Sequence, residues 1–555
     1  MNASKSEVTF FSRNTHESKY EPSLHIKKVD KVNGTVVKSP IPFNPTPTLL
    51  GVIYDRTLSF REHAVEVCKA ASNKVGMIAA VGNSQWGWNK EHLRQLYFAF
   101  LRSKMDYSGP GWQPWLCDSY MNLLERTQNK ALRLITGQLH SSPVESLRLE
   151  TSVTSYTTHS HRNTLKSIER AKRLPPHHPV SRALAEHVKP RTQHRSWARQ
   201  GKQLSTDHIP PEAELRQEIN LTRKPPWVHQ GTVTIFSSLE GVSNKADDPA
   251  TIRSAAEAAI ARWNSDLTIF TDGSAVSGFR QGGAAAVVMI NDDPPRYETL
   301  RTKGAAFTSS FEEECSAMEL AIDWITAGHC TQSSRPLIIT DSQSLCKELE
   351  GVDSAVDPLR TKLASCICNV GIQWVPGHCG IPGNELADQA ANEAKTISGP
   401  RIPSTYKALI PVINQQVTDP PCRPKYDYIA EVYSKMSRER ERTVDCKKDA
   451  VYLAQLRSGH HRDLRSYQHR VTKDTSTVIE PNCPRCGFSE ESISHLFDCP
   501  GTLALRQELF GTVEVPISSL TLHPRQSITL ARRSLRGVRK QQSSSQAAAT
   551  AATSH

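Results

Sequence analysis

The chain has 555 residues, of which 37% are hydrophobic and 22% are charged. A chain of this length is too long for a single hydrophobic core, and we expect about three or four domains. No run of roughly eighteen apolar residues is present, which excludes a membrane-spanning helix, and the N-terminus lacks the apolar stretch of a secretory signal. The net charge of +12 favours a polyanionic partner, most commonly nucleic acid. The thirteen cysteines are odd in number and mostly scattered, as expected for reduced thiols of an intracellular protein.

The first third of the chain changes from β-type to helical patterning. Residues 1–60 hold short β-type runs between proline-rich turns, whereas residues 61–173 are mostly helical in pattern. Gly137 is placed to end one of these helices. One apolar face that we expect to be core is formed by Leu93, Leu96, Tyr97, Phe100 and Leu101.

Residues 174–265 interrupt this pattern with the segments LPPHHP, HIPPEAE and RKPPW, and they are rich in basic side chains. Proline removes a backbone donor and breaks regular structure, so we expect a basic linker with little core of its own. Two interpretations of it stay open, a solvated spacer and a non-specific contact for nucleic acid.

Residues 266–398 alternate between strand-type and helix-type patterns in the order β-β-β-α-β-α-β-α. We therefore expect an α/β domain with a mixed five-stranded sheet and helices against its faces. Four acids lie near the ends of these elements. Asp272 directly follows the first strand, Glu314 opens a helix, Asp341 follows the strand PLIIT, and Asp388 lies in the first turn of the last helix. Any one of them alone reads as a turn or a cap, but clustered carboxylates are ligands for Mg²⁺ or Mn²⁺, and a pair of such ions supports phosphodiester hydrolysis.

The C-terminal part combines three patterns. Residues 399–475 are basic and helix-prone, 476–505 contain a cysteine/histidine cluster, and 506–555 read as a low-complexity tail. The cluster has the spacing C-x₂-C-x₈-H-x₃-C, which can close a tetrahedral structural zinc site on Cys483, Cys486, His495 and Cys499. Arg485 and the basic stretch from Arg462 to Arg470 are candidates for phosphate contacts.

The blocks TDGS, SSFEEECSAMELAI, ITDSQSL and WVPGHCGIPGNELADQAA together resemble the ribonuclease H family, in the form carried by non-LTR retrotransposon polyproteins. The resemblance implies a ribonuclease H fold and an RNA–DNA hybrid as substrate. It also implies that Asp272, Glu314, Asp341 and Asp388 bind two Mg²⁺ or Mn²⁺ ions. His378 resembles the mobile-loop histidine that moves protons and helps to release product.

The family's spacing favours Glu314 as the catalytic glutamate, with Glu313 as the alternative. That pattern has Ala three positions after this residue and a small or apolar residue seven positions after it, and Ala317 and Ala321 satisfy it only for Glu314. We expect Glu312 and Glu313 to be solvated near the helix N-terminus. Small or polar residues are also candidates for minor-groove contacts with the hybrid backbone, namely Gly273, Ser274, Ser309 and Ser310.

The flanking regions carry a weaker resemblance to the same polyproteins. The segment FNPTPTLLGVIYDRTLSF resembles the end of a reverse transcriptase palm, so that 1–60 would be a palm remnant and 61–173 a thumb or connection. The polymerase motif Tyr-x-Asp-Asp does not occur before this segment, and we expect no reverse transcriptase activity from this chain. The cluster at 483–499 resembles the zinc knuckle of such proteins. A nuclear location follows from the family and from the basic residues at 532–540.

These observations predict endonucleolytic hydrolysis of the RNA strand of RNA–DNA hybrids by a two-metal-ion mechanism, within part of a retrotransposon polyprotein. The alternative is a catalytically inactive relic that only binds nucleic acid. Another phosphoryl transfer on the same fold is a third interpretation. The sequence carries no signal for an oligomeric state.

Overall fold

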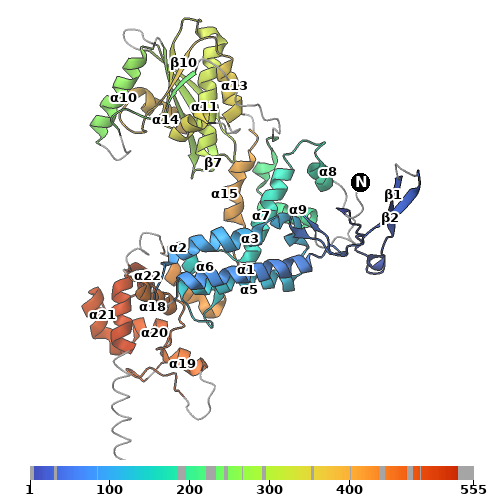
Figure 1. Cartoon of the computed structure of the whole chain (residues 1–555). Coiled ribbons are helices and arrows are strands. Elements are labelled where there is room, and N and C mark those ends of the chain that lie inside the picture. The colour runs from blue at the N-terminus through green and yellow to red at the C-terminus, as the bar shows by residue number, and fades with distance from the viewer. Residues whose placement is uncertain are drawn as a thin grey trace, which may run out of the picture. The chain divides into compact units, whose positions relative to one another are not determined.

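The computed structural model describes residues 5–29, 34–83, 85–185, 196–219, 233–242, 248–265, 267–290, 296–351, 356–399, 402–434, 436, 444, 446–471, 479–487 and 489–535. The chain forms two compact units (Figure 1). Unit 1 comprises Met1–Thr164, Lys189–Trp197 and Thr418–His555, and unit 2 comprises Leu165–Val188 and Ala198–Val417. Within the described residues no helix is long and apolar enough to cross a membrane.

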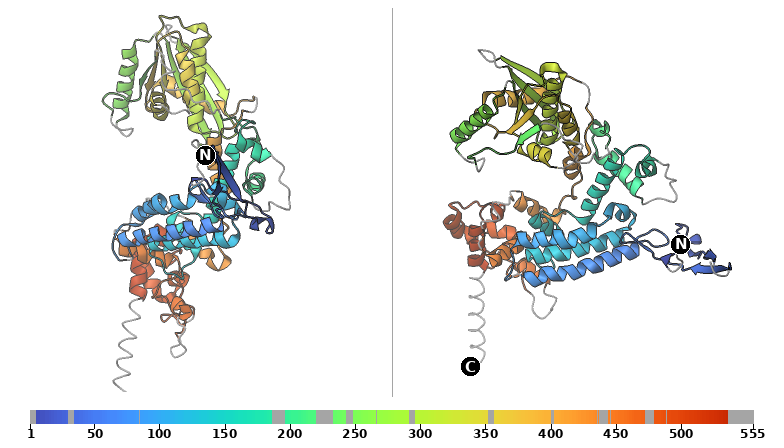
Figure 2. Two further views of the ribbon diagram at one scale, coloured as in Figure 1. Left: turned by 45° about the vertical axis from the view of Figure 1, so that its right-hand side comes forward. Right: turned by 45° about the horizontal axis from the view of Figure 1, so that its top comes forward.

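The N-terminal part of unit 1 begins with two small antiparallel sheets, β1 (Leu24–Val29) with β2 (Val36–Ile41) and β3 (Thr48–Leu49) with β4 (Val52–Ile53). A bundle follows, in which α1 and α5 lie side by side (Figure 2). Its helical elements are α1 (Arg61–Val81), α2 (Lys90–Leu96), η3 (Tyr97–Arg102), α3 (Ser103–Asp106), α4 (Gly109–Trp112), η4 (Gln113–Trp115), α5 (Asp118–Thr136), α6 (Val144–Thr151) and the start of α7 (Tyr156–Ala171). Gly137 ends α5 in the left-handed conformation, as its position in the sequence predicts.

The apolar face predicted around Leu93 is only partly buried. Leu93, Tyr97 and Leu101 are fully buried, whereas Phe100 is 44% exposed. The reason is that η3 is a π-helix, whose wider turn changes the phase of the face relative to an α-helix. The prediction that Phe100 belongs to the core was therefore wrong.

The C-terminal part of unit 1 is also built on an apolar core. Its helical elements are η9 (Pro424–Tyr426), α16 (Asp427–Tyr433), α18 (Lys447–Arg457), α19 (Arg465–Val471), α20 (Ile493–Asp498), η10 (Pro500–Thr502), α21 (Leu503–Phe510), α22 (Ser519–Leu522) and a helix over 524–535. Leu520, Ile528, Leu530 and Leu535 are buried in the same cluster as Ile493. The tail predicted over 506–555 was thus wrong for 506–535, because these apolar residues complete the core; residues 536–555 lie outside the described residues.

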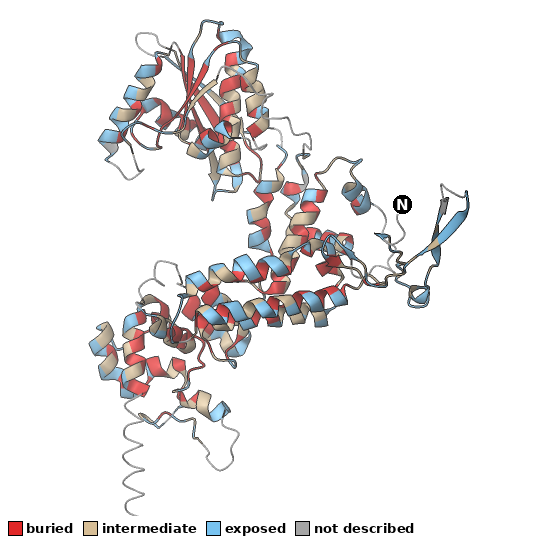
Figure 3. Cartoon of the chain, in the orientation of Figure 1, coloured by how far each residue is buried: buried red, intermediate tan, exposed pale blue. Residues whose placement is uncertain are grey.

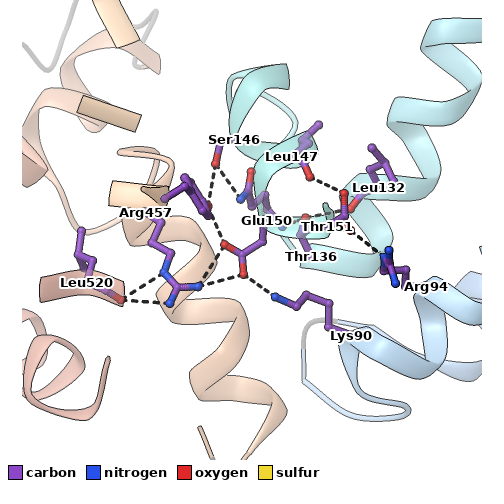
Figure 4. A network of polar contacts seen from close by, with 12 residues as sticks. Lys90, Arg94, Leu132, Thr136, Ser146, Leu147, Glu150, Thr151, Arg457 and Leu520 are labelled. Atoms are coloured by element: carbon purple, nitrogen blue, oxygen red, sulfur yellow. Dashed lines mark hydrogen bonds and ion pairs between the residues drawn. The ribbon is translucent and has the colours of Figure 1, made fainter. Parts of the chain in front are cut away.

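A buried ionic network joins the N-terminal and C-terminal parts of unit 1 (Figure 4). Glu150 of α6 is 3% exposed and receives Lys90 Nζ at 2.9 Å, Arg457 Nη1 at 3.2 Å and the Tyr433 hydroxyl at 2.6 Å. Arg457 also donates to the carbonyl of Leu520. Burial alone raises the pKa of Glu150, but the charges of Lys90 and Arg457 and the Tyr433 hydrogen bond outweigh it and lower the pKa to about 2. Segments far apart in sequence therefore form a single unit here.

The described parts of the segment predicted as a linker are folded. It contains α8 (Pro179–Ala185), α9 (Trp197–His208), η5 (Pro211–Glu214), β5 (Val233–Phe236) and α10 (Pro249–Trp263). Pro179, Pro211 and Pro249 stand at the first position of their helices, where the missing N–H costs nothing, so they start helices instead of breaking them. The described parts of 174–265 are therefore not a linker, and the prediction was wrong for them.

The large sheet of unit 2 has the strand order β5-β10-β9-β6-β7-β8, formed by β5, β6 (Leu267–Val276), β7 (Arg280–Ile290), β8 (Arg296–Lys303), β9 (Pro336–Thr340) and β10 (Val370–Trp374). β6, β9, β10 and β5 run parallel, whereas β7 is antiparallel to both of its neighbours, β6 and β8. The mixed sheet was predicted, but with five strands instead of six. The sixth is β5, a short strand from the supposed linker that pairs with β10.

Helices complete unit 2 around this sheet. They are α11 (Ser310–Trp324), η7 (Ile325–His329), α12 (Gln343–Glu350), α13 (Asp357–Ala364), α14 (Pro382–Ala394) and α15 (Tyr406–Gln416). β6, β7, β9 and β10 form the buried centre, and the helices carry exposed residues on their outer faces (Figure 3). This arrangement leaves one end of β6 and β9 beside the start of α11, where the candidate site lies.

Candidate active site

Two carboxylates meet because their strands are parallel neighbours. Thr271 of β6 pairs with Thr340 of β9, so Asp272 and Asp341, one residue further on, come side by side. Asp272 does not follow its strand, as the sequence predicted, but lies within it. The pairing of β6 with β9 stops at Thr271, whereas its pairing with β7 continues to Val276. Asp272 therefore lies at the place where the sheet opens on one side.

The third carboxylate reaches this place from α11. A Cβ atom on Gly273 would lie 2.1 Å from the backbone nitrogen of Glu314, so the helix start packs directly on β6 and requires glycine there. Ser309 caps α11 in a capping box with Glu312. One ligand oxygen from each of Asp272, Glu314 and Asp341 lies within 4.8 Å of the others.

The electrostatics of this trio fit a cation. Burial first, then Asp341 and Asp388, raise the pKa of Asp272 to about 7, although His378 and Lys395 act in the opposite direction. Burial, Asp341 and Asp272 raise the pKa of Glu314 well above its ordinary value, and its Oε2 has no hydrogen-bond partner. Carboxylates that are buried together repel each other unless positive charge neutralises them, and hard oxygen ligands suit Mg²⁺ or Mn²⁺.

The other two predicted residues lie at the rim. Asp388 of α14 is half-buried and outside the tight trio, but its charge reaches Asp272. His378 is exposed in the loop between β10 and α14, at φ +56°, and its charge also acts on Asp272. The structure therefore brings three of the five predicted residues into contact distance and places two beside them.

Two neighbours were not predicted from the sequence, Asn392 on α14 and Lys395 at the C-cap of that helix. Asn392 donates to the Asp388 carboxylate at 3.0 Å, and Lys395 Nζ donates to Asn392 Oδ1 at 2.7 Å. The positive charge of Lys395 lowers the pKa of Asp272. The signal was present, because Asp388, Asn392 and Lys395 recur at i, i+4 and i+7 on one helical face.

Some predicted roles near the helix start need correction. Glu313 was expected to be solvated but is 2% exposed against Gly282 and Gly304, and burial raises its pKa to about 7. Glu314 is thus the glutamate that faces the two aspartates. Gly273 and Ser309, expected to contact the hybrid, have structural roles in the packing and capping of α11.

The cysteine/histidine cluster forms a second candidate metal centre, in unit 1. One atom each from Cys483, Cys486, His495 and Cys499 lies within 4.8 Å of the others. Cys483 Sγ is 3.7 Å from Cys499 Sγ, and Cys486 Sγ is 3.3 Å from His495 Nε2. Three thiols and an imidazole gathered in this way are the donor set of a structural zinc site.

Arg485, predicted to contact phosphates, is turned inward. Its guanidinium lies 2.8 Å from Glu491 and donates to the carbonyl of Ser534 at 3.1 Å. The carboxylate of Glu491 also accepts the backbone N–H of Arg465, at the start of α19. Arg485 therefore links the cysteine/histidine cluster to Glu491 and Ser534. The prediction that it contacts phosphates was wrong.

Comparisons with known proteins identify the domain that contains the carboxylate trio. The sequence model of the RNase H family matches residues 264–396. A ribonuclease H from Treponema pallidum is 29% identical over 153 residues, which cover 23% of this chain and 89% of that protein. Residues 264–396 are thus an RNase H domain, and the chain carries the domain of a ribonuclease H hydrolase.

Solved structures that align with this part of the chain include RNase H1 from the halophilic archaeon Halobacterium salinarum, with 20% identity and a TM-score of 0.19 over 23% of this chain and 96% of that one. A second is the N-terminal RNase H domain of a Mycobacterium tuberculosis protein, with 17% identity and a TM-score of 0.20 over 23% of this chain and 98% of that one.

Proposed function

We propose that the chain hydrolyses the RNA strand of RNA–DNA hybrids endonucleolytically, with two divalent cations at Asp272, Glu314, Asp341 and Asp388. The observation that carries the proposal is the buried trio within 4.8 Å, which includes an unpartnered carboxylate oxygen on Glu314. When bound, such ions supply an activated water and stabilise the leaving oxygen of a phosphodiester.

The protein's own residues hold the carboxylates in position and supply a group that can transfer a proton. The register of β6 and β9 fixes the spacing of Asp272 and Asp341, and Gly273 brings Glu314 against them. His378 stands on an exposed loop near Asp272, where its imidazole can take up or give a proton as substrate binds and product leaves. The carboxylate of Asp388, which accepts a hydrogen bond from Asn392, completes the set of metal ligands from the edge of the site.

We further propose that the flanking regions come from a non-LTR retrotransposon polyprotein of the nucleus, and that Zn²⁺ binds Cys483, Cys486, His495 and Cys499. Support comes from the motif resemblance and from the gathered thiols. The zinc would be structural, because four protein ligands leave no open position for catalysis.

The substrate assignment is tested by incubating the full chain with end-labelled RNA–DNA hybrid, duplex RNA and duplex DNA of one sequence. We expect Mg²⁺-dependent cleavage of the RNA strand of the hybrid alone. Glu298→Gln, on the exposed part of β8, is the matched control and should cleave like the unmodified chain. Binding of hybrid without cleavage in Mg²⁺ or Mn²⁺ would instead support the inactive, nucleic-acid-binding alternative.

A further inference from the structure

A cationic and aromatic surface in unit 1 is used by neither metal centre. It is formed by Lys425, Tyr426, Tyr428, His460, Tyr467 and Arg470, and we call it the Lys425–Arg470 surface. Lys425 and Arg470 are exposed, and the three tyrosines are half-buried. Among the described residues, no acidic side chain forms an ion pair with Lys425 or Arg470.

The members of this surface lie close together although they come from different segments. Lys425 Nζ stands over the ring of Tyr426 at 4.9 Å, and the rings of His460 and Tyr467 are 5.7 Å apart. A Cβ atom on Gly459 would lie 2.3 Å from the Tyr428 hydroxyl, so this tyrosine packs against the loop that carries His460.

His460 differs from the other members of the Lys425–Arg470 surface because it is buried. It is 7% exposed, its Nδ1 lies 3.2 Å from the Ser141 hydroxyl, and its Nε2 has no hydrogen-bond partner among the described residues. Burial first, then the charges of Arg470 and Lys425, lower its pKa to about 4. Lys425 and Arg470 are therefore the cations whose charge acts on this buried imidazole, and a bound anion would offset that charge.

Two of the three nearby acids lie beside other basic side chains. Glu145 is held by Arg423 at 2.7 Å, and Asp463 lies 3.9 Å from His461. The third acid, Asp427, is exposed and lies between Tyr426 and Tyr428 in the sequence.

We propose that the Lys425–Arg470 surface binds single-stranded nucleic acid, with Lys425 and Arg470 on phosphates and the tyrosine rings against unpaired bases. Phosphates supply the anion, and the tyrosines supply π-faces that a duplex, whose bases are already stacked, does not use. This binding is separate from the hybrid chemistry of unit 2 and does not rest on it.

The scaffold of this surface is rigid. Tyr467 and Arg470 lie on α19, whose first backbone N–H is held by Glu491, beside the cysteine/histidine cluster. Ile429 of α16, Leu464 just before α19 and Ile493 of α20 share one buried core, which holds these helices relative to one another. The surface is therefore presented in a fixed arrangement, which favours affinity because little is ordered on binding.

The test is fluorescence anisotropy of labelled single-stranded RNA and single-stranded DNA of one sequence with the full chain, without Mg²⁺ and across a salt series. For Lys425→Ala with Arg470→Ala we expect at least about tenfold weaker binding and a salt dependence shallower by about 1.4, two phosphate contacts at about 0.7 each. Tyr426→Leu should weaken binding about fivefold to thirtyfold while the salt dependence stays unchanged, because it removes stacking and not charge.

The matched control is Lys69→Ala with Lys130→Ala, which removes two exposed cations from α1 and α5 of the same unit. It should bind like the unmodified chain, and all variants should melt at the same temperature. Affinity and salt dependence unchanged by loss of Lys425 and Arg470, or an equal loss in the control, would overturn the proposal. Different affinities of the unmodified chain for single-stranded RNA and single-stranded DNA would support the proposal and identify the preferred kind of strand.

Discussion

Replacement of Asp272 by Asn should stabilise the metal-free RNase H domain while it removes activity. In the absence of cations the pKa of Asp272 rises from its ordinary value of 3.8 to about 7, chiefly by burial and then by Asp341 and Asp388. Since a change of one in pKa corresponds to about 1.4 kcal/mol, ionised Asp272 destabilises the fold by up to about 4 kcal/mol. Asparagine keeps the shape and never carries the charge.

The size of the stabilisation by Asp272→Asn depends on pH. An acid with a raised folded pKa binds more protons in the folded than in the unfolded state, so the free energy of unfolding falls as pH rises through the window from about 4 to about 7. The stabilisation by Asp272→Asn should therefore be near zero at about pH 4 and reach roughly 2–4 kcal/mol at about pH 8.

Local stability is measured as hydrogen exchange of the β6 and β9 amides in the full chain, without Mg²⁺ or Mn²⁺ and corrected for intrinsic exchange rates. Glu298→Gln is the control for loss of an exposed carboxylate and should change little. A stabilisation that is equal at about pH 4 and about pH 8, or a variant less stable than the unmodified chain at about pH 8, would show that the charge of Asp272 does not destabilise the fold.

Three further predictions concern packing, the buried ion network and zinc. Gly273→Ala should lower hybrid cleavage about 100-fold, because a Cβ atom 2.1 Å from the backbone of α11 must displace the helix; Gly76→Ala, with nothing within 4 Å, should cleave normally. Glu150→Ala should destabilise unit 1 by about 3–5 kcal/mol in denaturant titrations, because it leaves Arg457 buried without its partner, and an effect below about 1 kcal/mol would contradict this. The stabilisation that Glu150 gives should disappear as pH falls from about 4.5 towards about 2, since its folded pKa is lowered. The full chain should contain one zinc ion by elemental analysis and give the absorption of a tetrahedral thiolate site with Co²⁺, and Cys499→Ser should lower metal content; no bound metal in the unmodified chain would refute the site.

The sequence predicted the sheet of the RNase H domain because its strands and helices alternate with clear periods. It missed β5 because a short strand carries little pattern, and its pairing with β10 depends on residues more than a hundred positions away. The helices within 174–265 were hidden by prolines, which act as helix starters only when the following residues can pack, as Ala256 and Trp263 do.

The candidate site was predictable to a similar degree. Asp272, Glu314 and Asp341 could be placed together, because strand ends and a helix start bring them to one edge of the sheet. The burial of Glu313 could not, because it depends on Gly282 and Gly304 leaving room on neighbouring strands. The inward turn of Arg485 likewise depends on Glu491 and on the carbonyl of Ser534, contacts that only the folded chain provides.

Metal-dependent hydrolysis at the carboxylate trio is tested by single-turnover cleavage of an end-labelled RNA–DNA hybrid by the full chain and by its Asp341→Asn variant, each with and without Mg²⁺. We expect RNA cleavage by the unmodified chain only when Mg²⁺ is present, and a loss of at least about 1,000-fold in the variant, which still binds the hybrid. Cleavage that persists in Asp341→Asn or without divalent cations would show that the carboxylate trio does not carry the reaction.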